Sequence, residues 1–221
     1  RGLAARLNEA IDLARGRYFA RMDQDDVSYP ERFARQIEAL QNDTRLNLVA
    51  VRAITIDEND QATGLFPYLL SHDEICARPW RGFYFPHPTW MGGIDWFRKH
   101  RYTVPGPYFC EDQDLLLRSF ASSRFGTVPE VLFAYRVRGK NNPAKQFGAR
   151  WSLLNIQLQY FYDTRKWIFG SLAIFVFAAR ILLDIYRMFC QLIGFHRRQS
   201  AHVFLSSYIA QLRKDYEELI F

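Results

Sequence analysis

Apolar side chains at the start of the chain recur with the period of a helix. Leu3, Leu7 and Ile11 fall on one face, and Gly16 stands where such a helix would end. Residues 18–22 then form a short apolar run that is typical of a buried strand. The pattern predicts a helix that leads directly into a strand.

A second helix and a second strand follow. Residues 28–31 form a capping-box pattern with proline in the first turn, so we expect a helix to begin there, with Phe33, Ile37 and Leu40 on its apolar face. The β-branched segment 46–56 predicts the next strand. Alternation of helix and strand predicts an α/β fold.

In the rest of the chain the residue pattern changes twice. Residues 63–107 are rich in aromatic residues, proline and glycine, which predicts loops with short elements. A helix is expected to start at residue 111 and a closing strand at 128–136. Because the pattern beyond is helical, we divide the chain into an α/β domain, residues 1–145, and a helical region, residues 146–221.

The first helix has no strand before it. In an α/β fold such a helix normally crosses over from an earlier parallel strand. We therefore expect that an N-terminal part of the sheet precedes Arg1 and is missing from this sequence.

Composition restricts the classes of protein. The 221 residues are 49% hydrophobic and 24% charged, which excludes a disordered chain, and the net charge of +6 suits an anionic ligand or membrane surface. No basic block indicates nucleic-acid binding, so no nucleic-acid partner is expected. The mean hydropathy of −0.22 excludes a polytopic membrane protein. The three distant cysteines fit neither a disulfide framework nor a zinc site, which favours a reducing compartment.

A first acidic cluster follows the first predicted strand. Asp23, Asp25 and Asp26 lie beyond the carboxyl end of that strand, where open α/β sheets bind ligands. Their carboxylates offer hard oxygen ligands to Mg²⁺ or Mn²⁺, which can bridge to a diphosphate. The alternative is an acidic turn that caps the next helix, but Ser28 already supplies a cap.

A second acidic cluster, Glu111, Asp112 and Asp114, opens a predicted helix. Acidic residues in a first helical turn complement the helix dipole in any protein, so this position alone indicates little. A metal-diphosphate site, however, needs a separate carboxylate to deprotonate an attacking hydroxyl. The two clusters together therefore predict an active site.

Taken in order, these motifs resemble the inverting family 2 glycosyltransferases with the GT-A fold. The resemblance covers about residues 2–138. It implies a Rossmann-like, mostly parallel sheet flanked by helices, N-terminally incomplete here, with a C-terminal helical appendage. The matching stretches are residues 7–26 with the DxD motif, 30–36, 87–91 with a His-Pro pair, 111–118 with the ED motif, and 128–136.

The resemblance also implies roles for the acidic residues. Asp112 is expected to be the catalytic base, and Asp23 and Asp25 are expected to hold Mg²⁺ or Mn²⁺ and the donor, together with Asp26. Close relatives often place a histidine after the closing strand, where this chain has Arg138, a fixed cation that could contact phosphate.

For the other candidate site residues two interpretations remain open. Arg118 either clamps the donor diphosphate or pairs with nearby acids. We place Glu111, His87 and Trp90 on the acceptor side. The alternative for His87 is a structural role. Trp90 either stacks on a sugar or belongs to the core. Asn8 faces either the nucleotide or solvent.

The expected function is transfer of a sugar, of the hexosyltransferase type, in cell-surface polysaccharide synthesis. The donor would be a nucleotide-diphosphate sugar, expected to be a UDP-sugar, and the acceptor a hydroxyl of a glycan or lipid-linked molecule. Two alternatives remain open: a glycoside hydrolase that works with two carboxylates, and a non-catalytic module that binds a membrane or a partner.

The helical region suggests a membrane surface. Residues 167–179 are 13 residues without a charge, shorter than the roughly 20 that span a bilayer. Arg180, Asp184 and Arg187 fall on one face, and basic residues 165–166 precede the run, as in a helix lying in an anionic interface. The alternative is a helix packed on protein. The expected location is cytoplasmic, peripheral at the inner face of the cell membrane.

Overall fold

The computed structural model describes residues 2–107, 109–137 and 142–192. The chain divides into two compact units, Arg1–Ile181 and Leu182–Phe221, and the second is described as far as Leu192. The described part contains helices and strands in the α/β order that the sequence predicts. The helices are α1 (Leu3–Leu13), α2 (Arg32–Asn42), α3 (His72–Cys76), α4 (Ile94–Lys99), α5 (Glu111–Ser119), α6 (Pro143–Asp163) and α7 (Trp167–Leu192). The strands are β1 (Tyr18–Ala20), β2 (Val27–Ser28), β3 (Leu48–Ile56), β4 (Ala62–Leu65), β5 (Met91–Gly93) and β6 (Phe125–Arg136).

The strands form one sheet in the order β1-β5-β3-β6-β2, with β4 paired to β3. Among the described strands β3 and β6 are the parallel pair, and the other four pairs are antiparallel. The α/β class is confirmed, but the expected mostly parallel sheet is not what these strands form. A tight turn joins β3 to β4 and so imposes an antiparallel pair, whereas β3 and β6 are connected by a long crossover that includes α5.

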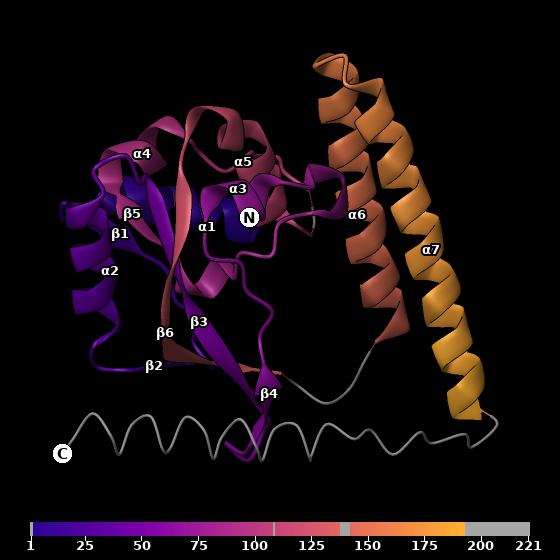
Figure 1. The fold of residues 1–221 in the computed structure, drawn as a ribbon, viewed down its shortest axis with the longest axis horizontal. Helices are drawn as coiled ribbons and strands as arrows, with labels where there is room; N and C mark the ends of the chain where they lie inside the picture. The colour runs from indigo at the N-terminus through magenta and orange to yellow at the C-terminus, as the bar shows by residue number, and fades with distance from the viewer. Residues whose placement is uncertain (1, 108, 138–141, 193–221) are drawn as a thin grey trace. The chain divides into compact units, whose positions relative to one another are not determined.

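Helices cover both faces of the sheet (Figure 1). On one face α2 packs Leu40 against Val49 and Met91. On the other face lies the main core, in which Ile11 of α1 and Leu116 of α5 are fully buried. Burial of apolar area on both faces fixes the strand ends and the loops that leave them.

The two long helices α6 and α7 also contribute to the main core. Leu154 and Phe161 of α6 and Ala173 of α7 are buried there. Residues 1–181 therefore form one compact unit, which includes α6 and the first part of α7.

The start of α2 differs from the sequence prediction. Ser28 lies in β2, where it is paired with Phe133 of β6, and α2 begins at Arg32 without a side-chain cap. Its buried face carries Arg32, Gln36 and Leu40, while Phe33 is 48% exposed. The hydrophobic pattern misplaced this face because two of its buried residues are polar.

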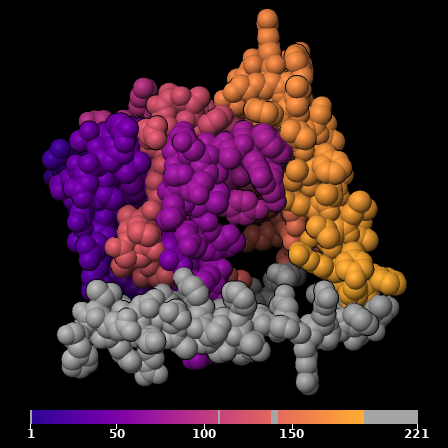
Figure 2. All heavy atoms as spheres, in the orientation of Figure 1, coloured from indigo at the N-terminus to yellow at the C-terminus, as the bar shows by residue number. Residues whose placement is uncertain are grey.

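The helix α7 is longer and more apolar than its uncharged run suggests. Trp167–Cys190 has a mean hydropathy of 2.1 over its most apolar window, so by length and composition it could cross a membrane, and 11% of that window is buried. The prediction that this segment is too short to span is therefore wrong by length and composition, because Arg180 ends the uncharged run but lies inside α7 and does not end the helix. Figure 2 shows side chains of α7, in orange, at the molecular surface.

Candidate active site

The first acidic cluster lies beside the His-Pro segment. β1 pairs with β5 in an antiparallel register that sets Ala20 opposite Met91. One residue further, the backbone N–H of Arg21 donates to the carbonyl oxygen of Trp90 at 2.8 Å. The loop that carries residues 23–26 therefore leaves the sheet next to the segment that contains His87.

Two polar residues of α2 hold this junction together. The Arg32 guanidinium is fully buried and donates to the carbonyl oxygens of Arg21 at 2.7 Å and Pro88 at 3.3 Å. The Gln36 amide donates to the carbonyl oxygen of Thr89 at 2.8 Å. Burial lowers the pKa of Arg32 to about 10, so it remains charged at neutral pH. Both residues stabilise the geometry of the strand ends.

Arg21 connects the two acidic clusters. Its side chain is 6% exposed, and its Nη2 lies 2.8 Å from Oδ1 of Asp23. The same charge lowers the pKa values of Glu111 and Asp112 on α5, against a larger rise caused by burial. Asp23 in turn raises the pKa of Glu111. Charges that influence one another in this way lie close together, so the loop carboxylates and the start of α5 share one site.

The surroundings of Asp112 shift the pKa of its carboxyl group in two opposite directions. Burial raises the pKa of its carboxyl group, and a hydrogen bond at 3.1 Å from the Gln113 amide to Oδ2 lowers it. Gln113 is itself fixed, because it accepts from the backbone N–H of Phe83 at 2.8 Å and donates to the Phe83 carbonyl oxygen at 3.2 Å. The Gln113 amide therefore holds the Asp112 carboxylate at the start of α5, where backbone hydrogen bonds also lower its pKa.

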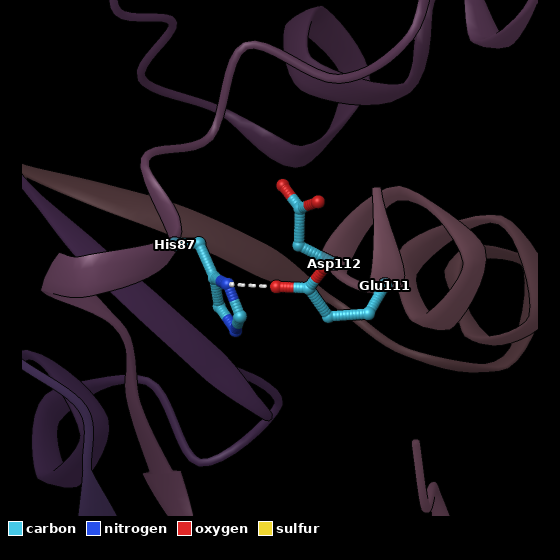
Figure 3. Close-up of side chains that lie close together, drawn as sticks. All are labelled: His87, Glu111 and Asp112. Atoms are coloured by element: carbon cyan, nitrogen blue, oxygen red, sulfur yellow. Dashed lines mark ion pairs between the residues drawn. The ribbon is translucent and has the colours of Figure 1, made fainter. Parts of the chain in front are cut away.

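His87 lies between Tyr102 and the second acidic cluster. Its Nε2 is 2.7 Å from the Tyr102 hydroxyl, and its Nδ1 is 3.6 Å from Oε1 of Glu111 (Figure 3). Burial and the charge of Arg21 hold the pKa of His87 well below its usual range, so the ring is neutral. Asn8, which is partly exposed, makes two hydrogen bonds with the backbone of Tyr102.

Two sets of side chains have the chemistry to hold a divalent cation. The ligand atoms of His87, Glu111 and Asp112 lie within 4.8 Å of one another (Figure 3). The predicted pair is different: Asp23 has 39% of its side chain exposed, and Asp25 is half-buried in the same loop. Both sets supply hard oxygen ligands, but only the first includes a nitrogen.

Comparison with known proteins shows a family resemblance. The family model described as "Glycosyl transferase family 2" matches residues 1–101, which contain the Asp23 loop and the His87 segment. This part of the chain is similar to glycosyl transferase family 2. The matched region ends before α5, so the assignment of the second cluster depends on the geometry above.

Three curated proteins to which this chain is similar are named as glycosyltransferases. It is 34% identical over 144 residues to the O-antigen biosynthesis glycosyltransferase WbnJ of Escherichia coli, covering 63% of this chain and 55% of the relative. It is 30% identical to the putative glycosyltransferase EpsE of Bacillus subtilis, covering 72% and 56%. It is 28% identical to the uncharacterized glycosyltransferase MJ1057 of Methanocaldococcus jannaschii, covering 64% and 49%. The chain thus spans about half the length of these relatives.

Among solved structures, the chain is similar to S. aureus TarS. The crystal structure of TarS 1-349 matches with a TM-score of 0.48 and 11% identity, over 71% of this chain and 45% of that one.

Asp26 is turned into the protein. It is 7% exposed, and its Oδ1 accepts from the backbone N–H of Arg136 at 2.8 Å. Arg136 also donates to the carbonyl oxygen of Asp25 at 2.7 Å. Asp26 therefore fastens the loop to β6 instead of contacting a donor, which corrects its predicted role.

Two further predicted site residues lie elsewhere. Trp90 is fully buried and donates to the Phe85 carbonyl oxygen at 3.2 Å, so it is a core residue and presents no face to an acceptor. Arg118 makes an ion pair with Asp114 at 3.0 Å and donates to the Arg101 carbonyl oxygen, which is the second of its two interpretations. Arg138 lies outside the described residues.

The sequence reasoning missed Arg21, Tyr102 and Gln113 as residues of the site. Arg21 carried a usable signal, since it is a charged residue in an otherwise apolar strand segment. Tyr102 and Gln113 carried none, because their roles depend on contacts with His87 and with Phe83, which are distant in the sequence.

Proposed function

We propose that this chain is part of an inverting glycosyltransferase that transfers a sugar from a nucleotide-diphosphate donor to a hydroxyl group of a glycan or lipid-linked acceptor. The observation that carries the proposal is the meeting of two carboxylate clusters around Arg21, one on a strand-end loop and one at the start of α5. A loop of this kind suits a donor diphosphate, and a separate carboxylate suits proton removal.

Asp112 is the proposed catalytic base. It would take the proton of the acceptor hydroxyl as that oxygen attacks the anomeric carbon. The bond from the anomeric carbon to the donor phosphate breaks on the opposite face, so the configuration inverts. Gln113 and Arg21 both stabilise the charged form of Asp112, which a base requires. The ordinary pKa of an Asp carboxyl group is about 3.9, well below neutral pH, and burial raises it from that value.

Asp23 and Asp25 are the proposed ligands of Mg²⁺ or Mn²⁺. Their side chains are partly open to solvent and supply hard oxygens, whereas the group around His87 includes the proposed base. When bound, the cation would stabilise the negative charge of the departing diphosphate. Arg21, fixed against Asp23, would add a second positive charge beside it.

The biological context comes from the relatives. One of them, WbnJ, is named for O-antigen biosynthesis, which supports a role in cell-surface polysaccharide synthesis and a glycan acceptor. A UDP-sugar donor and a hexose as the transferred sugar remain our proposal, as does action at the cytoplasmic side of the cell membrane.

The membrane part of the proposal depends on α7. Ile174, Phe175, Leu182 and Phe189 are each more than half exposed. The segment Trp167–Cys190 has 24 residues, enough to enter or cross a hydrocarbon core that needs roughly 20. We propose that α7 inserts into a lipid bilayer and keeps the active site near membrane-linked acceptors.

Calorimetry with UDP tests the donor site. The chain should bind UDP with Mn²⁺ and lose that binding in EDTA. As a matched control, Asp95→Asn removes a 94% exposed carboxylate and should leave binding unchanged. Absence of any metal-dependent binding would contradict the proposal and favour a binding module.

A further inference from the structure

A line of polar contacts joins α1 to α5 beneath the second acidic cluster. Asn8 of α1 fixes the backbone of Tyr102 with two hydrogen bonds, at 2.8 and 3.1 Å. The Tyr102 hydroxyl is 2.7 Å from Nε2 of His87, and Nδ1 of the same ring faces Glu111 at 3.6 Å. The first helix and the start of α5 are thus linked through Tyr102 and His87. Figure 3 shows the contact between His87 and Glu111.

The protons in this line can be assigned from the partners of each group. The neutral His87 ring has one nitrogen that donates and one that accepts. The Tyr102 hydroxyl is protonated, because burial raises its pKa above the ordinary value, and among the described residues it contacts His87. If the hydroxyl donates to Nε2, its proton is satisfied and the ring proton lies on Nδ1.

The opposite arrangement is unfavourable at both ends. With the ring proton on Nε2, the Tyr102 hydroxyl would receive a hydrogen bond and its own buried proton would have no acceptor. A lone pair of Nδ1 would then face the carboxylate of Glu111, which also offers lone pairs. The geometry therefore favours a proton on Nδ1.

We propose that Tyr102 fixes the tautomer of His87, and that His87 positions the Glu111 carboxylate to receive a hydroxyl of the acceptor next to the one that Asp112 deprotonates. Both are positioning residues. The first half stands on the contacts alone, and the second rests on the proposed function. The distance of 3.6 Å is longer than a hydrogen bond, and we expect it to shorten when an acceptor fills the site.

The two adjacent carboxylates, Glu111 and Asp112, would have different tasks. Glu111 would use one oxygen to accept from His87 and the other to bind the acceptor, so it orients. Asp112 is held by Gln113 through Oδ2 and would take the proton. The ED pair would thus contain one binding residue and one base.

Nuclear magnetic resonance of the ¹⁵N-labelled chain tests the tautomer without any assay of activity. Long-range ¹H–¹⁵N spectra distinguish a protonated from an unprotonated ring nitrogen, and His87 can be assigned among the 5 histidines with single variants. We expect the proton on Nδ1 of His87 in the unmodified chain. A proton on Nε2 would overturn the proposal, because His87 would then have nothing to donate to Glu111.

Tyr102→Phe removes only the hydroxyl that sets the tautomer. His87 should then shift measurably towards the form with the proton on Nε2. Tyr160→Phe is the matched control: it removes the hydroxyl of a partly buried tyrosine that packs on Phe120 and Phe161, and it should leave the His87 signals unchanged. An unchanged tautomer in a folded Tyr102→Phe chain would also overturn the proposal.

The kinetic consequence is a change in acceptor recognition. In the enzyme that contains this chain, Tyr102→Phe should raise the KM for the acceptor about tenfold, the size expected for one weakened charged hydrogen bond, and leave donor binding unchanged. Equal losses of donor and acceptor binding would contradict a positioning role. If donor binding with Mn²⁺ is absent in the unmodified chain, the proposed function fails while the tautomer result still stands by itself.

Discussion

In most proteins polar side chains are exposed and apolar side chains are buried. The start of α5 and the exposed face of α7 differ from this pattern in opposite ways. Around α5, charged and polar groups are buried: Arg21, His87 and Arg32 are each less than a tenth exposed. Along α7, large apolar groups are exposed: Phe175 and Leu182 are 71% and 67% accessible.

The difference teaches how each region obtains its stability. A buried charge persists only with partners that replace water, and the partners here are carbonyl oxygens and carboxylates at the strand ends. An exposed apolar face gains nothing from water and indicates a surface that something apolar covers. The buried polar groups near α5 therefore indicate a reactive site, and the exposed apolar face of α7 predicts contact with a membrane.

The largest expected effect is on catalysis. Asp112→Asn should lower turnover by about 10² or more, the contribution of a positioned general base, because an amide cannot take the proton. Steady-state transfer rates measure it, with Asp95→Asn as the control. If Glu111→Gln caused this loss while Asp112→Asn kept full activity, the base would be Glu111.

The second effect is on stability and tests the buried polar region directly. Arg32→Met should lower the free energy of unfolding by about 3 kcal/mol, because buried carbonyl oxygens lose their donor. Urea denaturation measures it. Arg35→Met, in the same helix but exposed and paired only with Glu38, should change it by less than about 0.5 kcal/mol. Equal effects of the two variants would mean that Arg32 does not hold the strand ends.

The third prediction concerns α7. The chain should sediment with lipid vesicles and remain bound in high salt, because apolar insertion is insensitive to ionic strength. Phe175→Asp should reduce the bound fraction several-fold, since a charge in the hydrocarbon region costs roughly 2.5–3.5 kcal/mol. Leu13→Asp, at a 73% exposed position of α1, is the control. Release by salt would instead indicate a helix lying on the surface, as the sequence suggested.

The smallest effect is on the pH profile. Burial raises the pKa of Asp112, and the hydrogen bond from Gln113 lowers it. Since the base must be ionised, activity should fall as the pH drops through that pKa. Gln113→Leu removes the stabilising bond, so the acidic limb should move to higher pH. Rate measurements across pH test the direction, and a limb that moves to lower pH would contradict it.

The sequence predicted the elements and the two acidic clusters because hydrophobic spacing and turn residues act locally. It misplaced the buried face of α2, since Arg32 and Gln36 are buried by contacts with the backbone of distant segments. For the same reason it could not assign Asp26 to the loop anchor or Trp90 to the core. Residue type predicted which groups are reactive, whereas tertiary contacts decide which of them face the site.

The central claim is that the Asp25 loop and Asp112 perform different tasks in one site. Calorimetric titration of UDP with Mn²⁺ into the Asp25→Asn and Asp112→Asn chains tests it most directly, with folding checked by circular dichroism. The account predicts that Asp25→Asn abolishes metal-dependent binding, while Asp112→Asn binds UDP as the unmodified chain does. Unchanged binding by Asp25→Asn would contradict the account.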